Sequence, residues 1–315
     1  MMELRKYEQG LKGSWDLFVK ESKNGTFLFL RDYMDYHSDR FEDCSYLVFN
    51  KDRIEALIPG NINGSTFYSH QGLTYGGLIQ SGDLKTSEVL EIFKELNNIL
   101  VATGIDDVII KPVPYIYHKI PAQEEIYALF INNAVKIACF ISTTIIQSNK
   151  IRFSELRRRG VKKALKSGFT VEESANYEFF WPILNENLGA RYSTSSVHTL
   201  SEIKKLGEIF PDNIKLYIVR SGEEILGGTV LYLSPNIVHV QYIAAGEKGK
   251  REGALDLLFD TLVNNIYLHI PVFDFGHSTT NGGRELNEGL IFQKEGFGGR
   301  GVVYDTYKYS IRNAM

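Results

Sequence analysis

Three basic side chains and three glycines stand together in the segment GEKGKREG, residues 246–253. Lys248, Lys250 and Arg251 supply positive charge, and glycine lets the backbone approach a ligand closely. The amphipathic stretch that follows predicts a helix, whose first N–H groups lack partners and carry partial positive charge. Together these features are suited to binding a phosphate or pyrophosphate. The alternative interpretation is an exposed polar turn whose charges only keep it solvated.

The turn matches neither of two widespread phosphate-binding patterns. It contains no GxxxxGK[ST], and it also lacks the strict GxGxxG of a dinucleotide-binding fold. The order of strand, basic glycine turn, helix and strand around it nevertheless weakens the solvated-turn interpretation.

Composition bounds the class of protein. The chain has 315 residues, with 35 Lys and Arg against 38 Asp and Glu, so its net charge is -3. A nearly neutral balance argues against an obligate nucleic-acid binder, although a local basic patch remains compatible with it. Cys44 and Cys139 form no CxxC pattern or Cys/His cluster, so we expect neither a metal site nor a disulfide framework.

The ends and apolar runs of the chain indicate its compartment. Residues 1–23 are charged and have no apolar core, so no signal peptide is expected. The longest apolar run, residues 135–146, is too short to span a bilayer and contains Lys136 and Ser142. We expect a soluble cytoplasmic protein without stable membrane insertion.

The predicted elements around the basic turn occur in the same order in the first half of the chain, so the chain contains a repeat. Residues 46–58 and 217–229 each read as a β-hairpin, with two apolar runs around a charged turn. Residues 88–104 and 254–269 both have the apolar period of a helix with one buried face. Each half then continues with a short strand, a helix and a long strand. The sequence therefore predicts two tandem copies of one α/β unit, each a mixed, mainly antiparallel sheet flanked by helices, over residues 1–150 and 151–315.

The join between the copies is a strongly basic helix. Residues 154–166 predict the helix, and Gly168 fits a position just after its C-terminus. Three interpretations remain open for its charge, of which a solvated inter-domain helix is favoured over contact with transfer RNA or with an anionic membrane or diphosphate-bearing precursor. The basic residues are Arg157, Arg158, Arg159, Lys162, Lys163 and Lys166.

Two family resemblances follow from these motifs. The order around residues 246–253 resembles the GNAT acyltransferase fold, and Lys250, Arg251 and Gly253 with the alanine after it are similar to the later part of the Q/R-x-x-G-x-G/A loop. Residues 273–276 (FDFG) and 285–299 (ELNEGLIFQKEGFGG) are similar to the Fem peptidyltransferase and FemAB-like group, which pairs two GNAT-like domains. The resemblance covers essentially the whole chain but lacks the long coiled-coil insertion of some Fem enzymes.

The GNAT resemblance implies direct acyl transfer from acyl-coenzyme A (acetyl-CoA) with no metal. A backbone N–H at Ile243 or Ala244 would polarise the acyl carbonyl, and Lys294 would contact the donor's phosphate. The alternative for Lys294 is an exposed lysine at a helix end. The residues expected to bind the donor are Ile243, Ala244, Gly246, Lys248, Gly249, Lys250, Arg251, Gly253 and Lys294.

Proton transfer needs a base near the donor strand, which is the strand before the basic turn that carries Ile243 and Ala244. The candidates are Asp274, His277, Tyr242 and Glu285, and the first two flank the end of a strand expected beside the donor strand. Asp274 could instead cap the next turn, and a lone histidine is more often structural. No serine or cysteine nucleophile is expected, because no GxSxG motif is present.

The first copy differs at the matching turn. HQGLTYGG, residues 70–77, has glycines but no Lys or Arg, so it does not suit a polyanion. Its polar side chains suit an acceptor, and we expect the first copy on the acceptor side and the second on the donor side. A buried, self-satisfied turn is the equally weighted alternative. Residues expected to bind the acceptor are His70, Gln71, Tyr75, Arg191 and Tyr192.

Three functions remain open from the sequence. The leading hypothesis is an N-acyltransferase that moves an acyl group from acyl-CoA to an amine on an amino sugar or other cell-envelope precursor. The alternative is a Fem-like peptidyltransferase of peptidoglycan precursor synthesis that uses aminoacyl-tRNA and therefore has transfer RNA as a partner. The third is a non-catalytic binding protein that retains the fold.

Overall fold

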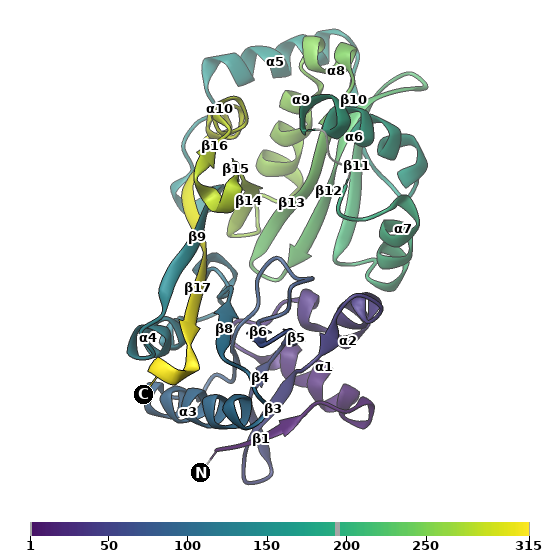
Figure 1. The fold of residues 1–315 in the computed structure, drawn as a ribbon. Helices are drawn as coiled ribbons and strands as arrows, with labels where there is room; N and C mark the ends of the chain where they lie inside the picture. Colours follow the sequence, from purple (N-terminus) through teal and green to yellow (C-terminus); the bar gives the residue numbers. More distant parts are fainter. Residues whose placement is uncertain (1, 193–195, 315) are drawn as a thin grey trace. The chain divides into compact units, whose positions relative to one another are not determined.

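The computed structural model describes residues 2–192 and 196–314 (Figure 1). The chain forms two compact units that are not continuous in sequence. Unit 1 contains residues 1–140, 279–285 and 303–315, and unit 2 contains residues 141–278 and 286–302.

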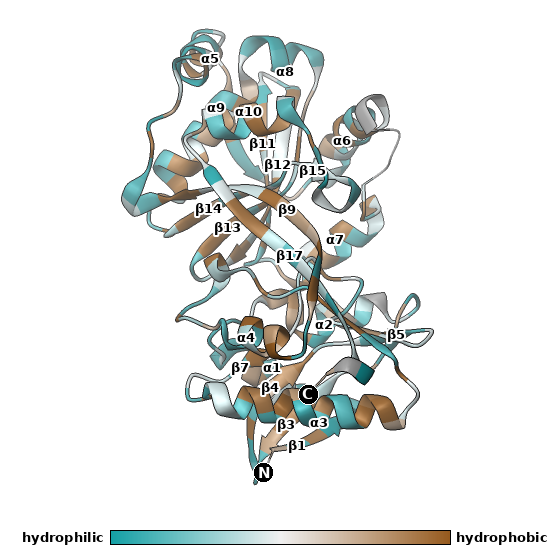
Figure 2. Cartoon of the chain, turned by 60° about the vertical axis from the view of Figure 1, so that its left-hand side comes forward, coloured by the Kyte–Doolittle hydropathy of each residue, from teal (hydrophilic) through white to brown (hydrophobic). Residues whose placement is uncertain are grey.

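Unit 1 builds its core around one long amphipathic helix, α3 (Thr86–Ala102). Apolar residues of α3 at helical spacing, such as Val89, Phe93 and Leu96, join the buried cluster of this unit. Figure 2 shows apolar and polar segments alternating along α3. The other helices are α1 (Lys12–Glu21), α2 (Arg31–Met34) and α4 (Glu124–Ile131).

Apart from the short pair β15 (Thr279–Thr280) and β16 (Glu285–Leu286), the strands of unit 1 form two groups. One is an antiparallel sheet in the order β1-β3-β4-β7, and the other runs β17-β8-β6-β5-β2, where only β6 and β8 are parallel. The bounds are β1 (Met2–Lys6), β2 (Glu42–Asp43), β3 (Tyr46–Asn50), β4 (Arg53–Ile58), β5 (Asn61–Asn63), β6 (Thr66–Tyr68), β7 (Ile79–Gln80), β8 (Asp107–Ile110) and β17 (Arg300–Ser310).

Unit 2 contains a single curved series of strands in the order β10-β11-β12-β13-β14-β9, all antiparallel except the pair β13 and β14 (Figure 1). The strands are β9 (Val135–Ile146), β10 (Thr170–Ser174), β11 (Ile214–Ser221), β12 (Glu224–Ser234), β13 (Ile237–Ala245) and β14 (Val272–His277). The helices are α5 (Glu155–Lys166), α6 (Tyr177–Tyr192), α7 (Leu200–Ile209), α8 (Glu247–Glu252), α9 (Ala254–Thr261), which continues as a π-helical turn (Leu262–Ile266), and α10 (Glu288–Gly296).

Alternation along β13 and β14 separates an apolar face from a polar one. Val238 and Val240 of β13 and Phe273 and Phe275 of β14 pack in the same cluster as Phe259 of α9. The intervening residues of both strands therefore project to the other face of the sheet. That face receives His239 and Asp274.

The units exchange their closing strands. β9, which ends the first predicted copy, pairs through residues 142–146 with β14 of unit 2. β17, which ends the second copy, pairs through residues 307–310 with β8 of unit 1. The compact units consequently differ from the predicted segments 1–150 and 151–315, although the predicted mixed α/β fold is confirmed.

The predicted joining helix forms as α5. Ser154 is its N-cap and accepts a hydrogen bond from the Arg157 N–H, while Gly168 has a φ of +73° just beyond the C-terminus. A left-handed residue there suits glycine because a side chain would be strained.

Candidate functional site

Strands β13 and β14 are paired only at their beginnings. The parallel register joins residues 237–239 to residues 272–274 and ends at the pair His239 and Asp274. Beyond it, a register shift between β12 and β13 leaves Gln241 as an extra residue, and Gly276 of β14 has a φ of +72°. A bulge bends its strand, and glycine permits the left-handed turn. We call these two segments, residues 239–245 and 274–277, whose strand pairing ends at His239 and Asp274, the fork.

A buried carboxylate lies where the fork begins. Asp274 is 0% exposed. Its Oδ1 accepts hydrogen bonds from Ser142 Oγ at 2.5 Å and Thr144 Oγ1 at 2.7 Å, both on β9, and its Oδ2 lies 2.7 Å from His239 Nδ1. Burial opposes ionisation, yet His239, Ser142 and Thr144 together keep the pKa of Asp274 below its usual value. Asp274 therefore holds the His239 ring and is itself held by β9.

His239 is a residue that the sequence did not single out. It lies in an ordinary apolar-polar alternation on β13, 35 positions from Asp274. Only the parallel register of β13 and β14 brings the two side chains together, and a signal for it would require aligning both strands in advance.

Lys294 does not lie at an exposed helix end. It is 5% exposed, and its Nζ donates to the carbonyl oxygens of Gly276 at 2.8 Å and His277 at 2.9 Å. Burial lowers the pKa of Lys294 to about 8, against the opposing attraction of Asp274. Lys294 thus holds the end of β14 from α10. It is not the exposed lysine of the alternative interpretation, and its ammonium donates to backbone carbonyls. Its contact with a donor's phosphate stays a prediction.

His277 and Tyr242 have environments that disfavour a base at neutral pH. His277 is exposed at the end of β14, yet desolvation by neighbouring parts of the chain, followed by the charges of Lys294 and His239, lowers its pKa. Tyr242 is buried, its hydroxyl lies 2.5 Å from His198 Nδ1, and burial raises its pKa to about 12. Neither group matches the neutral pKa that proton transfer favours.

Glu285, the fourth candidate base, belongs to unit 1, whereas Asp274, His277 and Tyr242 belong to unit 2. Its carboxylate accepts hydrogen bonds from Thr280 Oγ1 at 3.2 Å and Asn281 Nδ2 at 3.0 Å.

The basic glycine segment is a short helix with paired charges. Gly246 is the N-cap of α8, and α8 leads directly through Gly253 into α9. Lys248 forms an ion pair with Glu224 of β12, Lys250 with Glu247 at 2.7 Å and Arg251 with Glu252 at 3.1 Å. All three pairs lie at the surface, where such interactions contribute little and exchange readily for another anion.

Two glycines of this segment have packing roles. A Cβ at Gly249 would lie 2.2 Å from the carbonyl oxygen of Leu226, and one at Gly253 would lie 2.5 Å from the carbonyl oxygen of Gly160. Gly253 also has a φ of +82°. Close approach between elements explains both glycines without a ligand.

The first-copy candidates gather in one loop but have internal partners. The backbone N–H of Gln71 and its side-chain amide both bind Asn61, and the Tyr75 hydroxyl donates to Thr26 Oγ1 at 3.2 Å. His70 is buried at a φ of +66° and its ring contacts Phe41. These contacts fit the self-satisfied turn that was the alternative interpretation.

The corresponding strands of unit 1 stay joined. β6 and β8 are parallel like β13 and β14, and Ser69 N–H donates to the Ile109 carbonyl just beyond them. The loop then returns, so that Gly76 N–H donates to the Lys111 carbonyl at 2.6 Å and Gly76 forms a parallel bridge with Pro112. In unit 1 the loop after β6 thus continues the hydrogen bonding with the segment that follows β8.

Two acceptor candidates fall where side chains are not described. Arg191 and Tyr192 are the last residues of α6, and their side chains lie outside the described residues.

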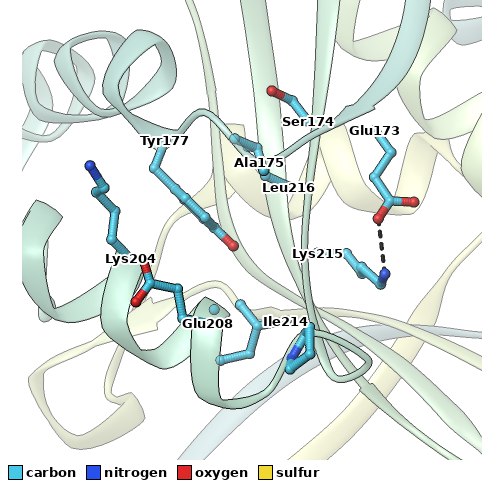
Figure 3. Close-up of a pocket in the computed structure, with 11 residues that line it drawn as sticks. Glu173, Ser174, Ala175, Tyr177, Lys204, Glu208, Ile214, Lys215 and Leu216 are labelled. Atoms are coloured by element: carbon cyan, nitrogen blue, oxygen red, sulfur yellow. Dashed lines mark hydrogen bonds and ion pairs between the residues drawn. The ribbon is translucent and has the colours of Figure 1, made fainter.

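A surface pocket of unit 2 lies away from the predicted residues. It is formed by β10, α6, α7 and β11, and Figure 3 shows Tyr177 directed across it. Glu173 forms an ion pair of 2.9 Å with Lys215 at its edge. None of its lining residues belongs to the fork or to the α8 segment.

Among the residues described, no group of three or more His, Cys, Asp or Glu side chains is arranged to hold a metal ion. No helix within the same residues is long and apolar enough to cross a membrane.

The fold of the chain is similar to that of solved structures that include a tandem GNAT protein. The chain is similar to FemX, with 13% identity, a TM-score of 0.68 and coverage of 98% of this chain and 97% of that one. L-PGS from Bacillus licheniformis has 13% identity, a TM-score of 0.60 and coverage of 97% and 93%.

A tandem GNAT protein from the clavulanic acid biosynthesis pathway has 9% identity, a TM-score of 0.53 and coverage of 99% of both chains. At such identities the likeness establishes the fold alone. No family model and no curated protein sequence matches the chain.

Proposed function

We propose that this protein is an N-acyltransferase that moves an acyl group from acyl-CoA to an amine of an amino sugar or other cell-envelope precursor. The observation that carries the proposal is the fork, which begins at His239 and Asp274 and leads along β13 to the start of α8. Diverging parallel strands leave backbone N–H and C=O groups facing the space between them, and a linear amide-bearing donor can pair with such groups.

The donor's two ends then have separate binding groups. Backbone groups at Ile243 and Ala244 hold the thioester end and polarise its carbonyl. The diphosphate lies against residues 246–253, where Lys248, Lys250 and Arg251 exchange their surface carboxylate partners for phosphate.

The roles of the two copies follow from the contrast between their parallel strand pairs. In unit 1 the loop after β6 returns to Pro112, whereas in unit 2 β13 continues to Ala245 beyond its last pair with β14. Residues 151–315 therefore supply the donor side, and residues 1–150 supply the acceptor side. The proposed acceptor-binding residues remain His70, Gln71 and Tyr75 in unit 1 and Arg191 and Tyr192 in unit 2.

A second candidate is a Fem-like transferase that uses aminoacyl-tRNA. The likeness in fold to FemX and the exposed basic face of α5 favour it. On that face Arg158 and Arg159 share Glu155, and Lys163 pairs with Glu252, so the anionic partners are fewer than the cations. Transfer RNA would then bind with a steep salt dependence.

Thermal unfolding with each donor tests the choice. A donor that binds only the folded protein stabilises it, by about 2.7 kcal/mol at 100 times its Kd. We expect acetyl-CoA to raise the Tm by several degrees, and the shift to vanish when Lys248, Lys250 and Arg251 are all changed to Glu.

The matched control changes Arg159, Lys162 and Lys166 on the exposed face of α5 to Glu, and it should keep the response to acetyl-CoA. If transfer RNA raises the Tm and acetyl-CoA does not, and the α5 variant abolishes that effect, the second candidate replaces the first. A chain that responds to neither donor would favour a binding protein that retains the fold.

A further inference from the structure

His239 occupies the point at which the strands part. It belongs to the last paired position of β13 and β14, and its side chain is 12% exposed. The ring lies beside Gly276, because a Cβ placed there would be 3.4 Å from His239 Cε1 and 3.9 Å from its Nε2. The imidazole is therefore largely enclosed and lies at the apex of the fork.

The environment of Nδ1 fixes the tautomer of the ring. Asp274 Oδ2 lies 2.7 Å from Nδ1, and an ionised carboxylate only accepts hydrogen bonds. Nδ1 therefore carries a hydrogen and Nε2 holds the lone pair in the neutral ring. The carboxylate cannot rotate freely, because Ser142 and Thr144 both donate to its other oxygen.

Polar and charged groups from three elements lie around His239. Asp274 and His277 come from β14, Lys294 comes from α10, and Ser142 and Thr144 on β9 supply neutral donors. Lys294 donates to two carbonyls at the end of β14, and its charge is attracted to that of Asp274. Of these charges only Asp274 stabilises a positive imidazole, and it makes the direct contact.

We infer that His239 is the general base of the transfer and that Asp274 is its positioning residue. This inference rests on the proposed function. His239 Nε2 takes a proton from the acceptor amine while the amine nitrogen attacks the acyl carbon. The C–N bond forms, the C–S bond breaks with its electron pair going to sulfur, and the imidazolium returns the proton to the thiolate. The products are an amide and a free thiol.

The position of His239 distinguishes it from the other candidate bases. Its ring is bound at Nδ1 by a buried carboxylate, the arrangement that orients a histidine base and stabilises its cation. Tyr242 instead contacts His198, and the residue after Gly276, His277, sits next to the buried Lys294 ammonium. Proximity to a positive charge disfavours a cationic His277 and leaves His239 as the base.

Kinetics of acetyl-CoA consumption test the inference. The probe is acetyl-CoA with a panel of amines, including glucosamine, and the readout is released thiol over a range of pH. His239→Asn keeps an N–H donor toward Asp274 and removes Nε2. General-base removal predicts a loss of about 10²–10⁴-fold in kcat/KM, with disappearance of the acidic limb of the pH profile and an unchanged acetyl-CoA Kd.

His277→Asn is the matched control and should keep the acidic limb. Asp274→Asn should shift the limb, because the positioning carboxylate is lost while Nε2 remains. If His239→Asn retains the wild-type rate and pH profile, His239 is not the base, although the proposed function stands. If wild-type protein neither binds nor consumes acetyl-CoA, the proposed function fails.

A readout without substrate keeps the inference testable in that last case. Nitrogen NMR of ring-labelled histidine, with the signal assigned by its loss in His239→Asn, reports which nitrogen carries the hydrogen. We expect the Nδ1–H form in wild type and its loss in Asp274→Asn. An Nε2–H form in the wild-type protein would overturn the inference.

Discussion

The ionised carboxylate of Asp274 is not exposed to water. Hydrogen-bond donors, among them Ser142, Thr144 and His239, must therefore stabilise its charge. An ionised carboxylate in such a place is costly unless each oxygen accepts hydrogen bonds. Ser142 and Thr144 supply two of these bonds from β9, which gives these small polar residues a role that their types alone do not suggest.

Removing either hydroxyl should destabilise the protein. We expect Ser142→Ala and Thr144→Val each to lower the free energy of unfolding by about 1.5–3 kcal/mol, since a hydrogen bond to a charged group is lost. Urea unfolding measures the change.

The matched control is Thr143→Val on the same strand. Thr143 is 1% exposed, and its hydroxyl has no hydrogen-bond partner among the described residues. This variant should be neutral or stabilising, because it removes an unsatisfied buried group. Equal losses at residues 142, 143 and 144 would contradict the account of Asp274.

Glu125 predicts a pH dependence of stability. It is buried on α4, accepts a hydrogen bond from the Leu78 N–H at 2.7 Å, and burial raises its pKa to about 8. Its folded pKa exceeds the unfolded value, so the unfolded state releases the proton first. Its stabilising contribution is complete below about pH 4.5 and declines as pH rises to about 8.

Replacement of Glu125 by Gln tests this sign. The Tm of Glu125→Gln minus that of wild type should increase between pH 4.5 and 8, because the amide cannot ionise. Thermal unfolding at several pH values gives the difference. A difference that stays constant over this range would show that Glu125 does not titrate as described.

At the scale of elements, helices α5 and α9 approach closely at a glycine. A Cβ on Gly160 would lie 1.8 Å from Asp256 Oδ2, and Asp256 in turn forms a 2.7 Å ion pair with Arg157. The contact joins the helix between the two copies to the helix that follows the α8 segment. The packing of α5 on α9 thus depends on one position without a side chain.

Gly160→Ala should therefore destabilise unit 2 despite the higher helix propensity of alanine. Overpacking typically costs about 1–3 kcal/mol, which outweighs the helix gain of about 1 kcal/mol. Gly289→Ala, in α10 with no close neighbour except Asn287 Oδ1 at 3.8 Å, is the control and should not destabilise. Chemical unfolding compares them, and a stabilised Gly160→Ala would refute the contact.

Local elements could be predicted from the sequence, but the fork could not. Apolar period and turn chemistry indicate the hairpins, α3, α5 and the long strands. The extra residue at Gln241 and the pairing of His239 with Asp274 depend on strand register, which no local pattern encodes. For the same reason Lys294 resembles an exposed helix-end lysine in the sequence, although it lies buried against β14.

At the scale of the whole molecule, the repeat and the compact units are different divisions of the chain. Each copy donates its last strand to the unit built mainly by the other copy, as β9 and β17 show. The exchange places Ser142 and Thr144, which come from the first copy, on Asp274 of the second.

A chain cut at the repeat boundary should consequently lack part of unit 2. We expect a fragment of residues 151–315 to be unfolded or much less stable than a fragment of residues 134–315, which restores β9. Circular dichroism and urea unfolding compare the two. Equal stability of the fragments would mean that β9 contributes little to unit 2.

Amide hydrogen exchange with and without acetyl-CoA tests the central claim most directly, because it reports where the donor binds. The fork account predicts slower exchange at residues 241–253 and 275–277 when acetyl-CoA is present. Protection confined to the pocket of α6, α7, β10 and β11, or no protection at saturating acetyl-CoA, would contradict the claim that β13 and β14 hold the donor.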